Sequence, residues 1–210
     1  MSSVVVRRVL IVQHGEKERL PGDPGLTALG HAQATATADW LLAREAPEAI
    51  WSSPLRRAVE TAEPIAERFG VDVVLDARLR ERMNWEGPHV ESIDEFLQDW
   101  QRASADRSYV PGSGDSSEQA AGRFLAALAD IGYTTHTSGL VVVVAHGGVT
   151  VDVLRTLLGD ESLLAAVPSL IDEGVPCGAI TELRHDTNRW VVDSLPVSDH
   201  LAPSTGHRPA

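Results

Sequence analysis

Residues 9–16 have the sequence VLIVQHGE, in which an apolar, mostly β-branched run ends at His14 and a glycine. Residues 140–148, LVVVVAHGG, repeat this arrangement, with the apolar run ending at His146. Continuous apolar runs of this kind predict strands of a sheet that helices cover on both faces. Ligands of such α/β sheets bind beyond the carboxyl ends of the strands. We therefore expect the two histidines to share one site.

Patterns typical of strands and helices alternate around these two runs. Strands are predicted at residues 4–13, 49–52, 71–75, 140–145, 179–184 and 190–193, and helices near residues 27–43, 54–69, 92–100, 124–131 and 149–158. The alternation predicts a three-layer α/β/α sandwich with a mainly parallel central sheet. Residues 1–200 are expected to form a single domain, and residues 201–210 a flexible tail.

Two local patterns add detail to this outline. In the helix that Thr27 is expected to cap, the spacing places several residues on one apolar face: Leu29, Ala32, Ala36, Trp40 and Ala43. Residues 78–89 and 104–117 lack any period and contain Gly-Pro and Pro-Gly pairs. These two stretches are expected to form loops that lie over the site and decide its specificity.

Charge and composition restrict the classes of partner. Of the 210 residues, 18 are Lys or Arg and 30 are Asp or Glu, which gives a net charge of −12. Such a surface repels nucleic acids and anionic membranes, so we expect neither as a partner. A small anionic substrate remains compatible with this charge if a few cationic side chains converge in one cleft.

The cysteine count and the longest apolar run indicate where in the cell the protein is expected. Cys177 is the single cysteine, so no intrachain disulfide can form, and a reducing cytoplasm is expected. The longest apolar run, residues 140–145, is far shorter than the roughly 18 residues of a membrane span. The eight histidines show no metal-ligand spacing, so no metal is expected.

Five blocks of this sequence resemble, in order, those of the histidine phosphatase superfamily, which is also named after cofactor-dependent phosphoglycerate mutase. They are QHGE at 13–16 with LTALGHAQA at 26–34, SSPLRRA at 52–58, LRE at 79–81 with WEG at 85–87, PGSGDS at 111–116 with Arg123, and VVVVAHGG at 141–148. The resemblance implies a phosphoglycerate mutase-like fold. It also implies a phosphomonoester hydrolase that acts on a small phosphorylated metabolite and needs no cofactor.

The resemblance also implies roles for individual residues. His14 would be the nucleophile, because a neutral imidazole attacks phosphorus when one nitrogen is held by a backbone carbonyl. Arg57 and His146 would stabilise charge on the phosphate oxygens, and His146 would act best when protonated. Glu81 would protonate the leaving oxygen, with Glu86 as the rival acid. Phosphate binding is expected from Gln13, Gly15, Lys17, Arg57, His146 and Gly147.

One position departs from the family pattern. The family has arginine where this chain has Gln13, so a permanent charge and a fork of donors are replaced by a neutral amide. Loss of a charge-assisted hydrogen bond of about 1.5–3 kcal/mol predicts an activity deficit of roughly tenfold to a hundredfold. Lys17 and Arg19, in the following loop, are the candidates for compensation.

Gln13 keeps a second class of function open. A degenerate family member could bind a phosphorylated ligand, another anion or a protein partner without turnover. The complete set of His14, Arg57, Glu81 and His146 favours the hydrolase over this binder. A phosphoglycerate mutase-type transfer is disfavoured, because the short chain offers little sequence for a pocket that excludes water. The sequence specifies neither the substrate nor an oligomeric state.

Overall fold

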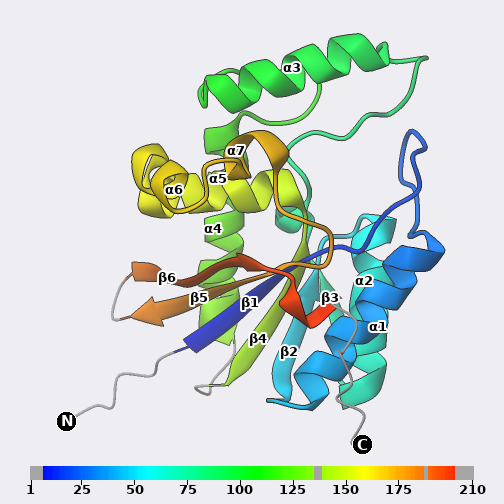
Figure 1. Ribbon diagram of the computed structural model, residues 1–210, viewed down its shortest axis with the longest axis vertical. Coiled ribbons are helices and arrows are strands. Elements are labelled where there is room, and N and C mark those ends of the chain that lie inside the picture. The colour runs from blue at the N-terminus through cyan, green and yellow to red at the C-terminus, as the bar shows by residue number, and fades with distance from the viewer. Residues whose placement is uncertain (1–6, 135–138, 187–188, 202–210) are drawn as a thin grey trace, which may run out of the picture.

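The computed structural model describes residues 7–134, 139–186 and 189–201 and is built around one six-stranded sheet with the order β3-β2-β4-β1-β5-β6 (Figure 1). Four neighbouring strands are parallel: β1 (Arg7–Gln13), β2 (Pro47–Ser52), β3 (Val73–Leu75) and β4 (Leu140–Ala145). β5 (Ile180–Asp186) and β6 (Arg189–Val197) are antiparallel to their neighbours. The prediction of a mainly parallel central sheet is confirmed.

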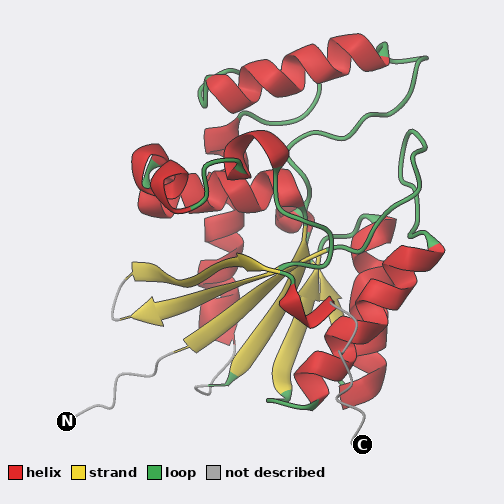
Figure 2. Ribbon diagram, viewed as in Figure 1, coloured by secondary structure: helices red, strands yellow, loops and turns green. Residues whose placement is uncertain are grey.

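Helices cover both faces of the sheet, as the buried apolar strands require (Figure 2). α1 (Ala28–Leu42) and α2 (Arg56–Phe69) lie on one face, and α4 (Ser117–Thr134) and α5 (Gly147–Leu158) lie on the other. Every residue of β4 is buried, and its side chains alternate between the two resulting cores. This is the expected three-layer sandwich.

The remaining helices lie toward one end of the sheet. α3 (Ile93–Ala105) begins with a capping box between Ser92 and Glu95 and lies beyond the carboxyl ends of the parallel strands (Figure 1). α6 (Asp160–Ala166) and α7 (Leu170–Glu173), which the sequence did not predict, pack through a third apolar cluster. Single 3₁₀ turns occur at Ala77–Leu79 and Asp199–Leu201. Within the described ranges, no helix has the length and apolar character of a membrane span.

The structure corrects the predicted face of α1. Thr27 caps this helix as expected, but its buried residues are Gly30, Ala34, Thr37, Ala38 and Leu41, while Leu29 is 55% exposed. Small residues prevail because the helix start approaches the loop after β1, where a Cβ on Gly30 would collide with the Glu16 carbonyl. Of the predicted first strand and tail, residues 4–6 and 202–210 lie outside the described residues.

Candidate active site

The sheet register places the two histidines side by side. β1 and β4 are parallel neighbours in which Gln13 pairs with Ala145, so His14 and His146 both follow the paired strand ends. The His14 amide donates to the Ala145 carbonyl at 3.1 Å, and the two ring centroids are 5.2 Å apart. Both side chains are buried. The structure thus brings together the residues on which the sequence analysis concentrated.

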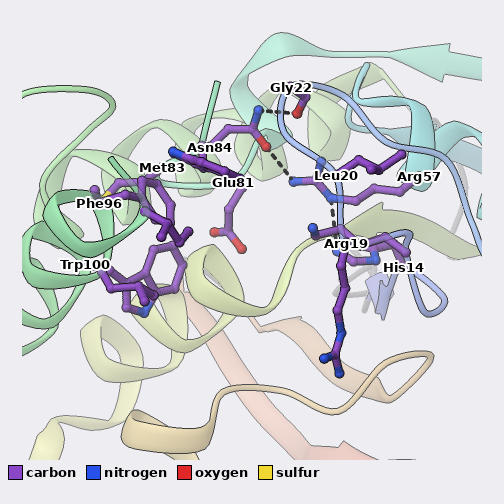
Figure 3. Close-up of a pocket in the computed structure, with 14 residues that line it drawn as sticks. His14, Arg19, Leu20, Gly22, Arg57, Glu81, Met83, Asn84, Phe96 and Trp100 are labelled. Atoms are coloured by element: carbon purple, nitrogen blue, oxygen red, sulfur yellow. Dashed lines mark hydrogen bonds between the residues drawn. The ribbon is translucent and has the colours of Figure 1, made fainter. Parts of the chain in front are cut away.

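Hydrogen bonds fix the tautomer of His14. Its Nδ1 lies 2.7 Å from the carbonyl oxygen of Gly15, which can only accept, so Nδ1 carries the hydrogen. Nε2 therefore has a free lone pair, toward which Nε of Arg57 points at 3.2 Å (Figure 3). Burial, together with the charge of Arg57, lowers the pKa of His14 to about 3. His14 is a neutral imidazole with its Nε2 lone pair available to a ligand.

Arg57, on the first turn of α2, is held by groups from two loops. Its Nη2 donates to Oδ1 of Asn84 at 3.3 Å, and Asn84 in turn donates to the Gly22 carbonyl at 2.7 Å (Figure 3). Its Nη1 lies 3.8 Å from a carboxylate oxygen of Asp23. The guanidinium is buried and oriented beside His14 before any ligand arrives, which reduces the entropy lost on binding an anion.

His146 is oriented by Ser53, a residue that the sequence analysis did not single out. The Ser53 hydroxyl oxygen accepts from the Leu55 amide at 3.3 Å and lies 2.7 Å from Nε2 of His146. The direction of this hydrogen bond depends on the tautomer of His146: when the Ser53 hydroxyl donates to Nε2, Nδ1 of His146 is the N–H. Burial, then the charge of Arg57, holds the pKa of His146 well below 6.5. We expected His146 to act best when protonated, whereas its burial favours the neutral imidazole.

Three buried polar atoms around His14 lack hydrogen-bond partners among the described residues: Nη1 of Arg57, Nδ1 of His146 and Oε1 of Gln13. Nη1 of Arg57 is a donor, and so is Nδ1 of His146 in the tautomer that accepts from Ser53; donors of this kind are complementary to phosphate oxygens. The third is an acceptor, because the amide nitrogen of Gln13 is the end that faces Nε2 of His14, at 3.5 Å. Gln13 thus lies beside His14, and its oxygen has no donor in the part of the chain that the structure describes.

Glu81 lies at the N-terminus of α5, on the opposite side of the cleft from Arg57 (Figure 3). Its carboxylate accepts from the amides of Gly148 at 2.9 Å, Val149 at 2.7 Å and Arg82 at 2.8 Å. The rival acid, Glu86, is exposed, accepts from Asn84 at 2.9 Å and does not line the cleft that holds His14. The geometry therefore favours Glu81 over Glu86.

Two connected cavities meet at His14, Lys17, Glu81 and Trp100. The larger one measures about 510 Å³ and also includes Arg19 and Arg57. The smaller one measures about 260 Å³ and is lined by Gln13 and Gly147 among others. Lys17 is half-buried, and burial lowers the pKa of its ammonium group, with the charge of Arg57 adding to the effect. Lys17 thus places a cation in the cavity that Gln13 and His14 line. There it can compensate for the charge that an arginine at position 13 would supply.

Gly15, which we expected to bind phosphate, lines neither of these cavities. Its amide donates to Thr61 at 3.0 Å, and its carbonyl holds His14. Gly15 therefore orients the His14 ring. Among the described residues, no group of three or more His, Cys, Asp and Glu side chains could hold a metal ion.

Gly148 is a further residue that the sequence reasoning missed. A Cβ at this position would lie 2.6 Å from the Trp100 ring and 2.7 Å from a carboxylate oxygen of Glu81. Only glycine lets both side chains approach the start of α5. The signal was present in the sequence as the second glycine after His146, but the two residues that require it lie 48 and 67 positions away in the chain.

Comparisons with known proteins agree with this geometry. A family model described as histidine phosphatase superfamily (branch 1) matches residues 9–197. The glucosyl-3-phosphoglycerate phosphatase of Mycolicibacterium vanbaalenii is 34% identical over 170 residues, which cover 73% of this chain and 75% of the relative. The metal-independent phosphoserine phosphatase of Arabidopsis thaliana is 30% identical over 218 aligned positions, gaps included, which cover 94% of this chain and 84% of the relative.

Solved structures give the same result. A mycobacterial glucosyl-3-phosphoglycerate phosphatase in complex with inorganic phosphate aligns with a TM-score of 0.73 at 28% identity, covering 92% of this chain and 99% of that one. YhfR of Bacillus stearothermophilus aligns with a TM-score of 0.75 at 25% identity, covering 93% and 99%. By sequence and by structure, the chain belongs to the histidine phosphatase superfamily.

Proposed function

We propose that this chain hydrolyses small phosphomonoesters through a phosphohistidine formed on Nε2 of His14. The observation that carries the proposal is the buried, neutral His14, whose Nδ1 is held by the Gly15 carbonyl at 2.7 Å while Nε2 faces the cleft. Named relatives are phosphatases for glucosyl-3-phosphoglycerate and phosphoserine, which supports a phosphomonoester as the substrate.

In the first step, the Nε2 lone pair of His14 attacks phosphorus in line with the leaving oxygen. Nε–H of Arg57 donates to this lone pair at 3.2 Å in the free protein, and when the ester binds it donates to a phosphate oxygen instead. Nη1 of Arg57 and Nδ1 of His146, both without hydrogen-bond partners in the described part of the protein, donate to the remaining equatorial oxygens. The bond from phosphorus to the leaving oxygen breaks, and Glu81 in its protonated form gives that oxygen a hydrogen.

The second step returns the enzyme to its starting state. The Glu81 carboxylate now takes a proton from a water molecule, whose oxygen attacks phosphorus. The bond between phosphorus and Nε2 breaks, and the electron pair returns to a neutral imidazole. Inorganic phosphate leaves, and Glu81 keeps the proton that the next leaving group requires. Oε1 of Glu81 accepts from the amides of Arg82 and Val149, whereas Oε2 accepts only from that of Gly148, so the second lone pair of Oε2 is the position for this proton.

The alternative function is a binder of phosphorylated ligands without turnover. It is favoured by one observation, the neutral amide of Gln13 beside the nucleophile, with its oxygen unpaired among the described residues. The two functions differ in one measurable quantity, the release of inorganic phosphate.

The test compares wild type with His14→Ala on p-nitrophenyl phosphate. We expect steady phosphate release from wild type only, and an acid-labile phosphoryl group on wild type after rapid quenching without acid. His31→Ala is the control, because His31 lies exposed on α1 outside the cleft, and it should retain wild-type turnover. Turnover of His14→Ala within a few fold of wild type would overturn the mechanism. Tight phosphate binding by wild type without turnover would favour the binder.

A further inference from the structure

The larger cavity has two chemically different sides. The charged groups lie around the nucleophile, whereas the far side is formed by six residues that we call the apolar wall: Met83, Trp85, Ile93, Phe96, Leu97 and Trp100. Figure 3 shows Met83, Phe96 and Trp100 across the cleft from His14, Arg19 and Arg57. When the phosphate lies at His14, the leaving group has to extend into the rest of this cavity. The apolar wall is the surface that it meets there.

Four wall residues form a stripe on α3 with the spacing i, i+3, i+4 and i+7: Ile93, Phe96, Leu97 and Trp100. Such a stripe normally faces the core of a globular protein. Here none of the four belongs to the described core clusters, and Ala103 is the buried residue of this helix. Ile93 and Leu97 remain 43% and 48% exposed at the cleft. Apolar surface left open next to a reactive site indicates a ligand that covers it.

The wall offers ring faces and aliphatic groups. The indole N–H of Trp85 already donates to the Glu91 carbonyl at 3.1 Å. The Trp100 ring carries the Arg82 guanidinium on one face at 4.4 Å and lies 6.2 Å from the Phe96 ring. A leaving group rich in hydroxyl or carboxylate groups would lose hydration against this surface and gain few hydrogen bonds in return.

We propose that the preferred substrate is a phosphomonoester of a bulky apolar alcohol or phenol, whose hydrocarbon part packs on the apolar wall. This proposal rests on the proposed phosphatase function, because it requires the phosphate to lie at His14. A cavity of about 510 Å³ is large enough for a phosphate with a two-ring aromatic group or a medium alkyl chain.

The kinetic test uses pairs of esters. 2-Naphthyl phosphate and phenyl phosphate have similar leaving groups but differ by one ring, and the added apolar area predicts a kcat/KM about tenfold higher for the naphthyl ester. n-Hexyl phosphate should likewise exceed O-phosphoserine, although serine is the better leaving group. Equal kcat/KM values within either pair, or a preference for O-phosphoserine, would overturn the proposal.

Two variants locate the preference on the wall. Leu97→Ser and Ile93→Ser alter half-exposed side chains, so the fold should survive, and each should reduce the ratio of naphthyl to phenyl kcat/KM severalfold. Leu42→Ser is the matched control, because Leu42 is equally exposed at the end of α1 and lies outside the cleft. An unchanged ratio in both wall variants would show that the preference arises elsewhere.

A binding measurement separates failure of this proposal from failure of the phosphatase function. 2-Naphthyl phosphate and phenyl phosphate are titrated into His14→Ala by calorimetry, which needs no turnover. A Kd about tenfold lower for the naphthyl ester supports the wall even if wild type hydrolyses nothing. Equal Kd values overturn it, and normal turnover of both esters by wild type would then leave the phosphatase function intact.

Discussion

The family resemblance implies an arginine at the position of Gln13, and the structure indicates how this difference can be tested. Its side chain borders the smaller cavity of about 260 Å³, which leaves space for a longer side chain. We predict that Gln13→Arg raises kcat/KM on phenyl phosphate about tenfold or more, because it adds a charge-assisted bond to the phosphate. Phosphate inhibition should tighten in parallel, and both constants are measured by steady-state kinetics.

Gln13→Met is the matched control, since it keeps the length of the side chain and removes the amide. It should show no gain in either constant. If Gln13→Arg also shows no gain, the missing-charge explanation is wrong, and Lys17 becomes the residue that supplies the charge. Its half-buried ammonium lines both cavities, so Lys17→Met should then lower kcat/KM in the wild-type background.

Glu81 permits a test that depends on the leaving group. We predict that Glu81→Gln lowers kcat at least tenfold more on n-hexyl phosphate than on p-nitrophenyl phosphate, because only the poor leaving group needs a proton in the transition state. Glu86→Gln is the control from the same loop and should reduce both rates equally or not at all. Equal losses in Glu81→Gln would assign the proton to another group.

At the scale of elements, Arg123 of α4 holds the loop that carries Glu81. Its guanidinium donates to the carbonyls of Arg78 at 2.6 Å, Arg80 at 2.7 Å and Glu81 at 3.0 Å. Removal of the donors leaves these carbonyls without partners, so Arg123→Met should cost about 1–3 kcal/mol of unfolding free energy. It should also impair n-hexyl phosphate turnover more than p-nitrophenyl phosphate turnover, because Glu81 loses its position.

The control for Arg123 is a surface arginine of similar chemistry. Arg68 is 40% exposed and pairs with Asp39 at 2.6 Å, and such exposed pairs contribute at most about 1 kcal/mol. Arg68→Met should therefore leave the ratio of the two rates unchanged, and its urea midpoint should shift less than that of Arg123→Met. If Arg123→Met keeps the wild-type ratio of the n-hexyl phosphate rate to the p-nitrophenyl phosphate rate, Arg123 contributes to stability only.

The sequence predicted the elements whose signals are local. Uninterrupted apolar runs identified β1 and β4, and Thr27 identified the start of α1. The buried face of α1 was predicted wrongly, because close approach selects small residues that hydrophobicity ranks low. α6 and α7 have seven and four residues, too few for a period to be recognised.

Contacts within the site were less predictable than the elements that carry it. The bond from Ser53 to His146 joins residues 93 positions apart, and the bond from Arg57 to Asn84 joins residues 27 apart. The stripe of α3 predicted a helix correctly, but a period of 3.6 residues does not distinguish a face on a core from a face on a cleft. Family resemblance supplied His14, Arg57, Glu81 and His146 as candidates, and the structure supplied the tautomer of His14.

At the scale of the whole molecule, burial of ionisable groups in the site links stability to pH. Burial lowers the pKa of His14 to about 3 and that of His146 well below 6.5, and it raises the pKa of Asp152 to about 6. Below pH 6.5 the unfolded chain binds a proton at each of these histidines and the folded protein does not, so the histidines reduce stability as pH falls. Asp152 acts in the opposite direction between pH 3.8 and about 6, because there the folded protein holds the extra proton.

We predict that His14 alone accounts for about 1 kcal/mol of lost stability between pH 6.5 and 5.5, because over this interval its imidazole goes from half to roughly nine-tenths protonated in the unfolded chain and stays neutral in the folded protein. His14→Asn keeps a donor for the Gly15 carbonyl but cannot titrate, so wild type should lose about that much more unfolding free energy than the variant. Urea unfolding at the two pH values gives the loss for each protein. His146 and Asp152 contribute equally to both losses, so their contributions cancel when the two losses are subtracted. His31→Asn, which changes an exposed histidine, should lose stability as wild type does. Equal losses in wild type and His14→Asn would mean that His14 becomes protonated in the folded protein above pH 5.5, and the neutral nucleophile would then have to be abandoned.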